Sequence, residues 1–300
     1  MIIEAVGPTF LLVAVGYALG RFGKIPTDPF VKLSFWLLSP ALIFETLRTS
    51  QLPAGEAGLV ALFVLVHYGL MFLASLVAGR VLFPGDLGGQ RVTSLLLTFG
   101  NCGNLGLPIL YFAYGRRAMD VGVIFLATNT VLLATLGVGI ASWQGKGRWR
   151  DFGKNILGAP WLYAVGLGAL MRVTQAWPGI LAQATQLLFQ AAIPVFLLLL
   201  GLELAAVDFK ALARPALILA GARLILGAAL AWPLAFLFTG DRLIRASLII
   251  EGSVPSAVNA YILAAQYRHK PDLAAASLLL STAFSLGTLS LTLFLLSRFG

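Results

Sequence analysis

Two polar motifs stand out from an otherwise apolar sequence, because their amide and hydroxyl groups could bind an anion. The first reads T-F-G-N-C-G-N-L-G-L-P and places Asn101 and Asn104 three residues apart, on roughly one face of a helix. The second reads E-G-S-V-P-S-A-V-N and contains Pro255, Ser256 and Asn259. Glycine and proline weaken a helix, and backbone N–H groups freed at an interruption can hold an anion. The alternative is that both motifs are proline-kinked helices that only pack against their neighbours.

Three further polar side chains lie inside long apolar stretches of the sequence, and these are Glu251, Arg223 and Asn129. If such a stretch crosses a membrane, a charge at its centre costs about 3 kcal/mol or more and is seldom without a role. Glu251 could then bind a coupling ion or a proton, and Arg223 could hold the carboxylate of a substrate or balance its charge. Two structural alternatives stay open. Arg223 and Glu251 could form an ion pair, and His67 could simply be hydrogen-bonded within the fold.

The composition indicates which elements must position these residues. Of the 300 residues, 59% are hydrophobic and 11% are charged, and the mean hydropathy is +0.91. Soluble domains carry about 25% charged residues, so this chain needs lipid around it, and its long apolar runs favour helices over a barrel. We therefore expect an all-α integral membrane protein with ten transmembrane helices, near residues 3–20, 28–47, 57–79, 91–114, 119–142, 157–174, 181–202, 213–237, 242–265 and 272–296.

The distribution of lysine and arginine predicts how these helices are oriented. The net charge is +9, and thirteen basic residues lie on the side of loop 143–155, against seven on the opposite side. We expect the protein to lie in the cell (inner) membrane. Because cytoplasmic loops carry the excess of basic residues, we expect this loop in the cytoplasm and both termini on the outer side. Basic residues in short loops between apolar runs are the usual pattern of membrane topology, so we expect membrane lipid and not nucleic acid as a partner.

The two halves of the chain align on one another with a single ungapped shift. Pro40 falls on Pro194, and by the same shift each of the first five expected helices falls on one of the last five. An odd number of helices in each copy makes the second copy enter the membrane from the other side, as in the inverted repeats of secondary transporters. We expect a first repeat over 1–142, a cytoplasmic linker over 143–156 and a second repeat over 157–300, with the fourth and ninth helices interrupted at the same depth.

Four motifs together give the chain a specific resemblance. They are G-Y-A-L-G-R-F-G-K-I-P followed by L-S-P-A-L-I-F, then N-C-G-N-L-G-L-P, A-I-P-V-F-L-L-L-L-G-L-E-L and V-P-S-A-V-N-A-Y-I-L-A-A-Q-Y-R-H-K-P-D-L. In this order and spacing they make the chain similar, over essentially its whole length, to the auxin efflux carrier family. That family includes the plant PIN proteins and many bacterial carriers. The chain lacks the very long cytoplasmic loop of the long PIN proteins and resembles the short, bacterial type.

The resemblance implies a transporter fold similar to that of the bile-acid symporters. The first, second, sixth and seventh helices would form a scaffold, often dimeric, so we expect a homodimer, and helices 3–5 and 8–10 would form a transport domain. The family's substrate asparagine matches Asn101, and its crossover proline matches Pro255. Known family substrates are organic acids, including indole-3-acetate and small dicarboxylates. We predict a substrate site formed by Asn101, Gly103, Asn104, Pro108, Pro255, Ser256 and Asn259, with Glu251, Arg223 and Asn129 as candidates for ion or proton coupling.

The function that these features predict is transport of an organic anion by alternating access. A sodium-coupled symporter of the bile-acid type is the nearest alternative, because Glu251 would suit a sodium ligand. A receptor or channel with the same helices is a further alternative. An intramembrane enzyme is not expected, because the sequence has only His67 and His269 and no H-E-x-x-H motif. The single Cys102 excludes a multi-cysteine metal site, so no cofactor is expected beyond a coupling Na⁺ or H⁺.

Overall fold

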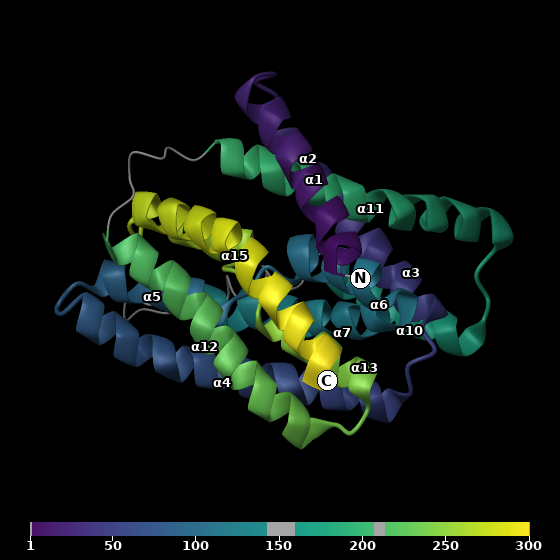
Figure 1. Cartoon of the computed structure of the whole chain (residues 1–300). Coiled ribbons are helices and arrows are strands. Elements are labelled where there is room, and N and C mark those ends of the chain that lie inside the picture. Colours follow the sequence, from purple (N-terminus) through teal and green to yellow (C-terminus); the bar gives the residue numbers. More distant parts are fainter. Residues whose placement is uncertain (1, 143–159, 207–213, 300) are drawn as a thin grey trace.

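The computed structural model describes residues 2–142, 160–206 and 214–299, and in these ranges the chain is built from helices (Figure 1). Those of the first half are α1 (Ile2–Arg21), α2 (Asp28–Leu33), η1 (Ser34–Leu38), α3 (Ser39–Thr49), α4 (Ala54–Leu82), α5 (Leu87–Thr98), η2 (Cys102–Gly106), α6 (Leu107–Tyr114), α7 (Arg116–Leu132), η3 (Leu133–Gly137) and α8 (Val138–Ser142). Those of the second half are α10 (Pro160–Thr174), α11 (Gly179–Ala205), α12 (Arg214–Phe238), α13 (Arg242–Gly252), α14 (Val258–Gln266) and α15 (Pro271–Phe299). The segments η1, η2 and η3 are π-helical.

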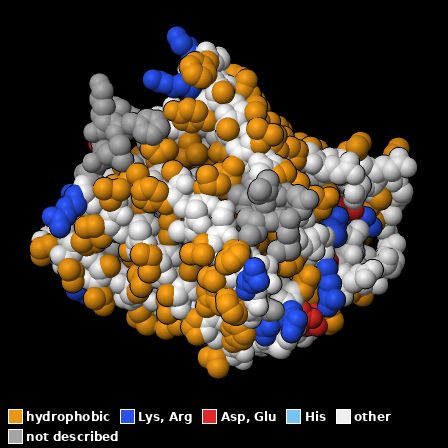
Figure 2. Space-filling model, viewed as in Figure 1, with side chains coloured by type: hydrophobic (Ala, Val, Ile, Leu, Met, Phe, Trp, Pro, Cys, Tyr) orange, Lys and Arg blue, Asp and Glu red, His pale blue; other side chains and the backbone are white. Residues whose placement is uncertain are grey.

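Several of these helices can cross a membrane. Six helical stretches in the described part of the chain are long and apolar enough by length and composition. They are Asp28–Thr49, Ala54–Leu82, Arg116–Ser142, Gly179–Ala205, Arg214–Phe238 and Pro271–Phe299. Large apolar side chains are exposed along them, and Figure 2 shows hydrophobic groups spread over the visible face. Apolar surface on this scale needs lipid rather than water, so the chain is a multi-pass integral membrane protein.

The helices lie close to the ten ranges that the sequence predicts, but two of those ranges are interrupted. The predicted fourth helix contains α5, η2 and α6, and the predicted ninth contains α13 and α14. These pieces, like the short α10, fall below the length of a candidate span. The ten-span inverted topology therefore stays a prediction. The predicted linker 143–156 lies outside the described residues.

Two groups of helices pack closely within themselves, and further contacts, such as that of α1 with α6, join the two groups. In the first, α1 lies along α11, and α3 contacts both α10 and α11; these are the predicted scaffold helices. In the second, α12 contacts α4, α5, α13 and α15, and Figure 1 shows these helices running below α1 and α11. Within the first group, an added Cβ at Gly16 or Gly201 would collide with the backbone of the facing helix. Small residues let membrane helices approach closely, which explains the glycine at both positions.

The two interruptions pair with one another. After α5 the chain is extended at Phe99 (φ −95°, ψ 125°), and Pro255, which has no N–H group, lies in the link between α13 and α14. The N–H of Asn101 donates to the carbonyl of Pro255 at 2.8 Å, and the N–H of Ala257 donates to that of Phe99 at 2.9 Å. Backbone polar groups inside a membrane must be satisfied within the protein. The two links satisfy each other, and the interrupted helices therefore cross at this point.

Candidate functional site

A cavity of about 90 Å³ lies at this crossover, between the two groups of helices. Its walls come from the link before η2, from η2 itself, from α7 and from the start of α14 on one side, and from η1, α3 and α11 on the other. Of the π-helical segments in the described residues, η1 and η2 contribute to it, and such segments are frequent at functional sites. The structure brings five of the residues predicted from the sequence into this lining: Asn101, Gly103, Asn104, Asn129 and Asn259.

Asn101 has a hydrogen-bonding group that the protein leaves unused. The side chain is 5% exposed, and its Oδ1 accepts the N–H of Asn104 at 3.3 Å at the start of η2. Its Nδ2 has no hydrogen-bond partner among the described residues. Leaving a buried donor unpaired costs about 1–3 kcal/mol, and an oxygen of a ligand in the cavity would remove that cost.

Other amides extend this polar lining. Asn129 on α7 is 5% exposed, and its Oδ1 has no partner among the described residues. Asn259, in the first turn of α14, is exposed. Gly103 packs closely against α7, because an added Cβ would lie 3.2 Å from the side chain of Leu126. The cavity thus offers uncharged donors and acceptors, which suit a carboxylate that also carries other polar groups.

Arg223 on α12 is fully buried against the crossover. Its Nε donates to the carbonyl of Val254 at 3.0 Å. Its Nη1 donates to the carbonyls of Leu97 at 2.8 Å and Thr98 at 3.3 Å. These acceptors lie at the end of α5 and just after α13, where helix carbonyls lack partners and carry partial negative charge. One guanidinium group therefore holds both interruptions together.

Glu251, in the last turn of α13, is also fully buried, but its surroundings differ. Neither carboxyl oxygen has a hydrogen-bond partner among the described residues. An added Cβ at Gly106 would collide with Oε2, and one at Gly122 would lie 2.9 Å from Oε1. The carboxyl group therefore packs against two glycine backbones. Glu251 and Arg223, both among the described residues, do not form an ion pair with each other, because the Arg223 guanidinium donates to backbone carbonyls instead.

Three of the predicted substrate residues frame the crossover instead of lining the cavity. Pro108 lies in the first turn of α6, where proline suits a helix start. The carbonyl of Pro255 accepts the N–H of Asn101, and the Oγ of Ser256 donates to the carbonyl of Leu96 at 2.9 Å. These residues shape the interruptions, and their contact with a substrate stays a prediction.

Sequence reasoning missed part of the lining, most of which lies outside the two polar motifs, whereas Cys102 lies inside the first. The missed residues include Phe35, Ser39, Cys102, Thr130 and Phe196. Ser39 and Phe196 could have been suspected, since they lie inside the family motifs L-S-P-A-L-I-F and A-I-P-V-F-L-L-L-L-G-L-E-L. His67 has a structural partner, because its Nε2 lies 3.1 Å from the carbonyl of Gly227 and joins α4 to α12.

The chain is similar in sequence to known membrane transport proteins. The family described as membrane transport protein matches residues 1–154 and 150–294. The chain is 26% identical to an uncharacterized transporter of Methanothermobacter thermautotrophicus over 301 residues, which cover 96% of each chain. It is 27% identical to an uncharacterized transporter of Methanocaldococcus jannaschii over 300 residues, which cover 94% of each chain. The chain therefore belongs to the membrane transport protein family, the family of the auxin efflux carriers.

Proposed function

We propose that this protein is a secondary transporter that moves a small organic anion by alternating access, with the anion bound in the crossover cavity. The observation that carries the proposal is the Nδ2 group of Asn101, a buried donor without a partner among the described residues, in a side chain that lines the cavity. An amide N–H binds a carboxylate oxygen well. A site between two helix groups can open to either side when one group moves against the other.

The size of the cavity favours a small carboxylate, such as malonate or malate, over an indole acid. Sites for drug-sized molecules have volumes of roughly 300–1,000 Å³, whereas this cavity has about 90 Å³. Phe35 and Phe196 form walls on the scaffold side that would limit a longer ligand.

The position of Arg223 favours transport without sodium over the sodium-coupled alternative. In transporters with interrupted helices, carbonyls of the unwound backbone and of half-helix ends coordinate Na⁺. Here the guanidinium donates to such carbonyls from both interruptions. We infer that the Arg223 guanidinium balances the partial negative charge of these carbonyls, as a bound sodium ion would. A second cation at the crossover would then be repelled.

Glu251 is the residue to which we assign proton coupling. An ionised carboxylate buried without partners is costly, so the neutral acid suits the closed packing against Gly106 and Gly122. If α13 moves relative to η2 and α7 during transport, water can reach the carboxyl group and the proton can leave. Proton transfer would then be linked to the movement that carries the anion.

Exchange in proteoliposomes tests this function. Protein in liposomes that contain unlabelled malonate or malate should take up the labelled acid, with sodium and choline as the external cation giving equal rates. Asn101→Ala should insert and purify normally but slow exchange by about tenfold or more, and Asn259→Ala should act more mildly. Gln183→Ala, which removes an exposed amide of α11, is the matched control. Exchange that requires sodium would favour the symporter alternative instead.

The proposed orientation has a separate test. We propose that loop 143–155 is cytoplasmic and that both termini lie outside, because basic residues are concentrated on the side of this loop. A cysteine at Gly145, in a Cys102→Ala background, should resist a membrane-impermeant maleimide added to whole cells. Rapid labelling from outside would reverse the orientation.

A further inference from the structure

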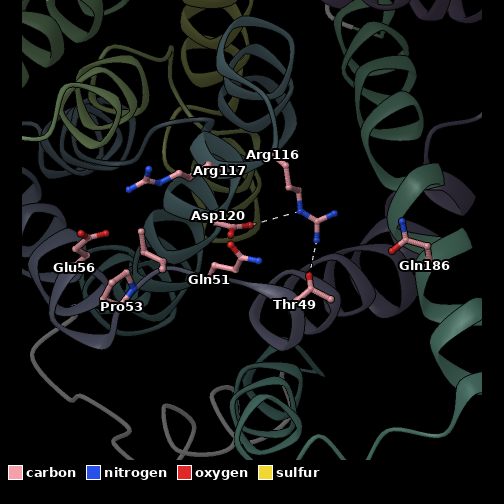
Figure 3. A pocket seen from close by; sticks show the side chains of 9 residues that line it. Thr49, Gln51, Pro53, Glu56, Arg116, Arg117, Asp120 and Gln186 are labelled. Carbon is pink, nitrogen blue, oxygen red and sulfur yellow. Dashed lines mark hydrogen bonds and ion pairs between the residues drawn. The ribbon is translucent and has the colours of Figure 1, made fainter.

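A second and larger cavity lies away from the crossover, at one end of the helices. It has a volume of about 560 Å³ and lies where α3 ends, α4 and α7 begin and α11 passes (Figure 3). That volume is within the range of roughly 300–1,000 Å³ found for small-molecule sites. The predicted topology puts this end on the face opposite loop 143–155. The cavity therefore has the size and the place of an entry or exit site.

Two cations stand at the start of α7, where a helix does not favour them. Arg116 and Arg117 are its first residues, and Gly115 before them provides no side-chain cap. The N-terminus of a helix carries partial positive charge, so basic side chains there are unfavourable and a bound anion is favourable. Arg117 is 64% exposed, and its Nη2 lies 3.6 Å from the carboxylate of Asp241, which is beyond hydrogen-bond distance. This contact is an exposed ion pair with Asp241, and such pairs are weak, so an anion in the cavity can compete with Asp241 for the Arg117 guanidinium.

Arg116 is held in place across the boundary between the two helix groups. Its Nη2 donates to the Oγ1 of Thr49 on α3 at 2.7 Å, and its guanidinium lies 4.1 Å from the centre of the Phe189 ring on α11. Its Nε lies 3.6 Å from Oδ1 of Asp120, as Figure 3 shows. A guanidinium oriented in this way before a ligand arrives loses little entropy on binding a carboxylate.

The cavity also contains acceptors that lack donors. Asp120 is only 6% exposed, and its Oδ1, which is ion-paired with Nε of Arg116 at 3.6 Å, accepts no hydrogen bond from the described residues. Oε2 of Glu56, a buried atom in the first turn of α4, likewise accepts no hydrogen bond from them. Buried polar atoms are nearly always paired. One oxygen of each carboxylate is therefore open to a ligand that brings a hydrogen-bond donor as well as a negative charge.

We propose that this cavity is a second binding site, for a small carboxylate that also carries a hydroxyl or amino group. Arg116 and Arg117, whose side chains point to opposite sides of the cavity in Figure 3, each offer a cation to a carboxylate oxygen, and Asp120 and Glu56 accept the donor. The role of the site as a station of the transported anion rests on the proposed function, whereas the binding itself does not. Because Arg116 contacts both helix groups, a ligand on it also competes with Thr49 for the contact that joins them.

L-malate and succinate are suitable probes, because they have the same length and differ by one hydroxyl group. Binding is measured by calorimetry on protein in nanodiscs, in an Asn101→Ala background that weakens the crossover site. We expect malate to bind about tenfold more tightly than succinate, and the further change Arg117→Gln to weaken malate by about tenfold or more. The matched control is Arg242→Gln, which removes an exposed cation from the first turn of α13.

Three results would overturn this inference. They are no malate binding to the Asn101→Ala protein, equal affinity after Arg117→Gln, and equal weakening by Arg242→Gln, which would indicate a general effect of surface charge. Arg117 is exposed, so its variant is expected to fold, and gel filtration checks this. Binding that depends on Arg117 in a protein without any carboxylate exchange would remove the proposed function and leave this site standing.

Discussion

The surroundings of Arg223 and of Glu251 differ more than their positions suggest. Both side chains are fully buried, and their helices α12 and α13 contact each other. Arg223 donates to three backbone carbonyls from the two interruptions. Glu251 has no partner for either oxygen among the described residues and packs against Gly106 and Gly122.

This difference separates a charge that supports the fold from a group that can change its state. The carbonyls around Arg223 would be left unpaired in its absence, so the crossover depends on this arginine. Among the described residues, no group forms a hydrogen bond or an ion pair with Glu251 that would stabilise a charge there. We therefore expect the removal of Arg223 to damage the fold, and the neutralisation of Glu251 to alter transport alone.

The largest expected effect is that of Arg223→Met. The methionine fills much of the space but leaves three buried carbonyls without donors, and each hydrogen bond to a charged group contributes roughly 1.5–3 kcal/mol. The free energy of unfolding should fall by at least about 3 kcal/mol, measured by chemical denaturation in detergent. The free energy of unfolding of Arg223→Lys should lie between those of the parent protein and Arg223→Met, because one ammonium group cannot reach both interruptions as the planar guanidinium does. A stable, active Arg223→Met protein would remove the distinction between the two buried groups.

The next effect concerns the glycine backbone beside Glu251. A methyl group at Gly106 would meet the Glu251 carboxyl before any other side chain, and overpacking of this kind costs about 1–3 kcal/mol. Gly106→Ala should therefore lower the free energy of unfolding by that amount. In a Glu251→Ala background the same change should cost less than about half as much, because the space is then empty. Equal costs in both backgrounds would mean that the two residues do not touch.

Glu251→Gln should change stability little, because it replaces a partnerless carboxyl by a neutral group of the same shape. We expect a change within about 1 kcal/mol, together with anion exchange that no longer depends on pH. Exchange by the parent protein should depend on pH. A variant that is strongly destabilised, or that keeps the pH dependence of the parent, would separate Glu251 from proton coupling.

The smallest effect is expected for an exposed ion pair, which serves as a reference for the two buried groups. Lys270 Nζ lies 2.8 Å from Asp86, and its hydrogen bond to that carboxylate lowers the pKa of Asp86, helped by the N–H of Gly89. Both side chains are 41% exposed, so Lys270→Ala should cost less than about 1 kcal/mol at pH 7. Because folding lowers the pKa of Asp86, the ion pair stabilises the protein at pH values above the ordinary carboxyl pKa of about 4. This stabilisation is lost as the pH falls through the lowered pKa. Denaturation at pH 7 and pH 3 measures the difference.

The sequence predicts the parts of the site that depend on local chemistry. Glycine and proline mark both interruptions, and the asparagines beside them line the cavity, because a broken helix is a property of a short segment. The acceptors of Arg223 could not be predicted in this way, since Leu97 and Val254 lie more than a hundred residues apart and meet only in the fold. The cavity around Arg116 was missed for the same reason, because the ends of separate helices build it.

The most direct test of the crossover as the substrate site is a binding measurement with Asn101→Ala. Titration of malonate into the purified protein by calorimetry gives the affinity without the complications of flux. Loss of one amide hydrogen bond to a carboxylate, roughly 1.5–3 kcal/mol, should weaken malonate binding by about ten- to a hundredfold while the unfolding temperature stays that of the parent. Unchanged affinity in a folded Asn101→Ala protein would place the substrate elsewhere and contradict the assignment of the crossover cavity as the substrate site.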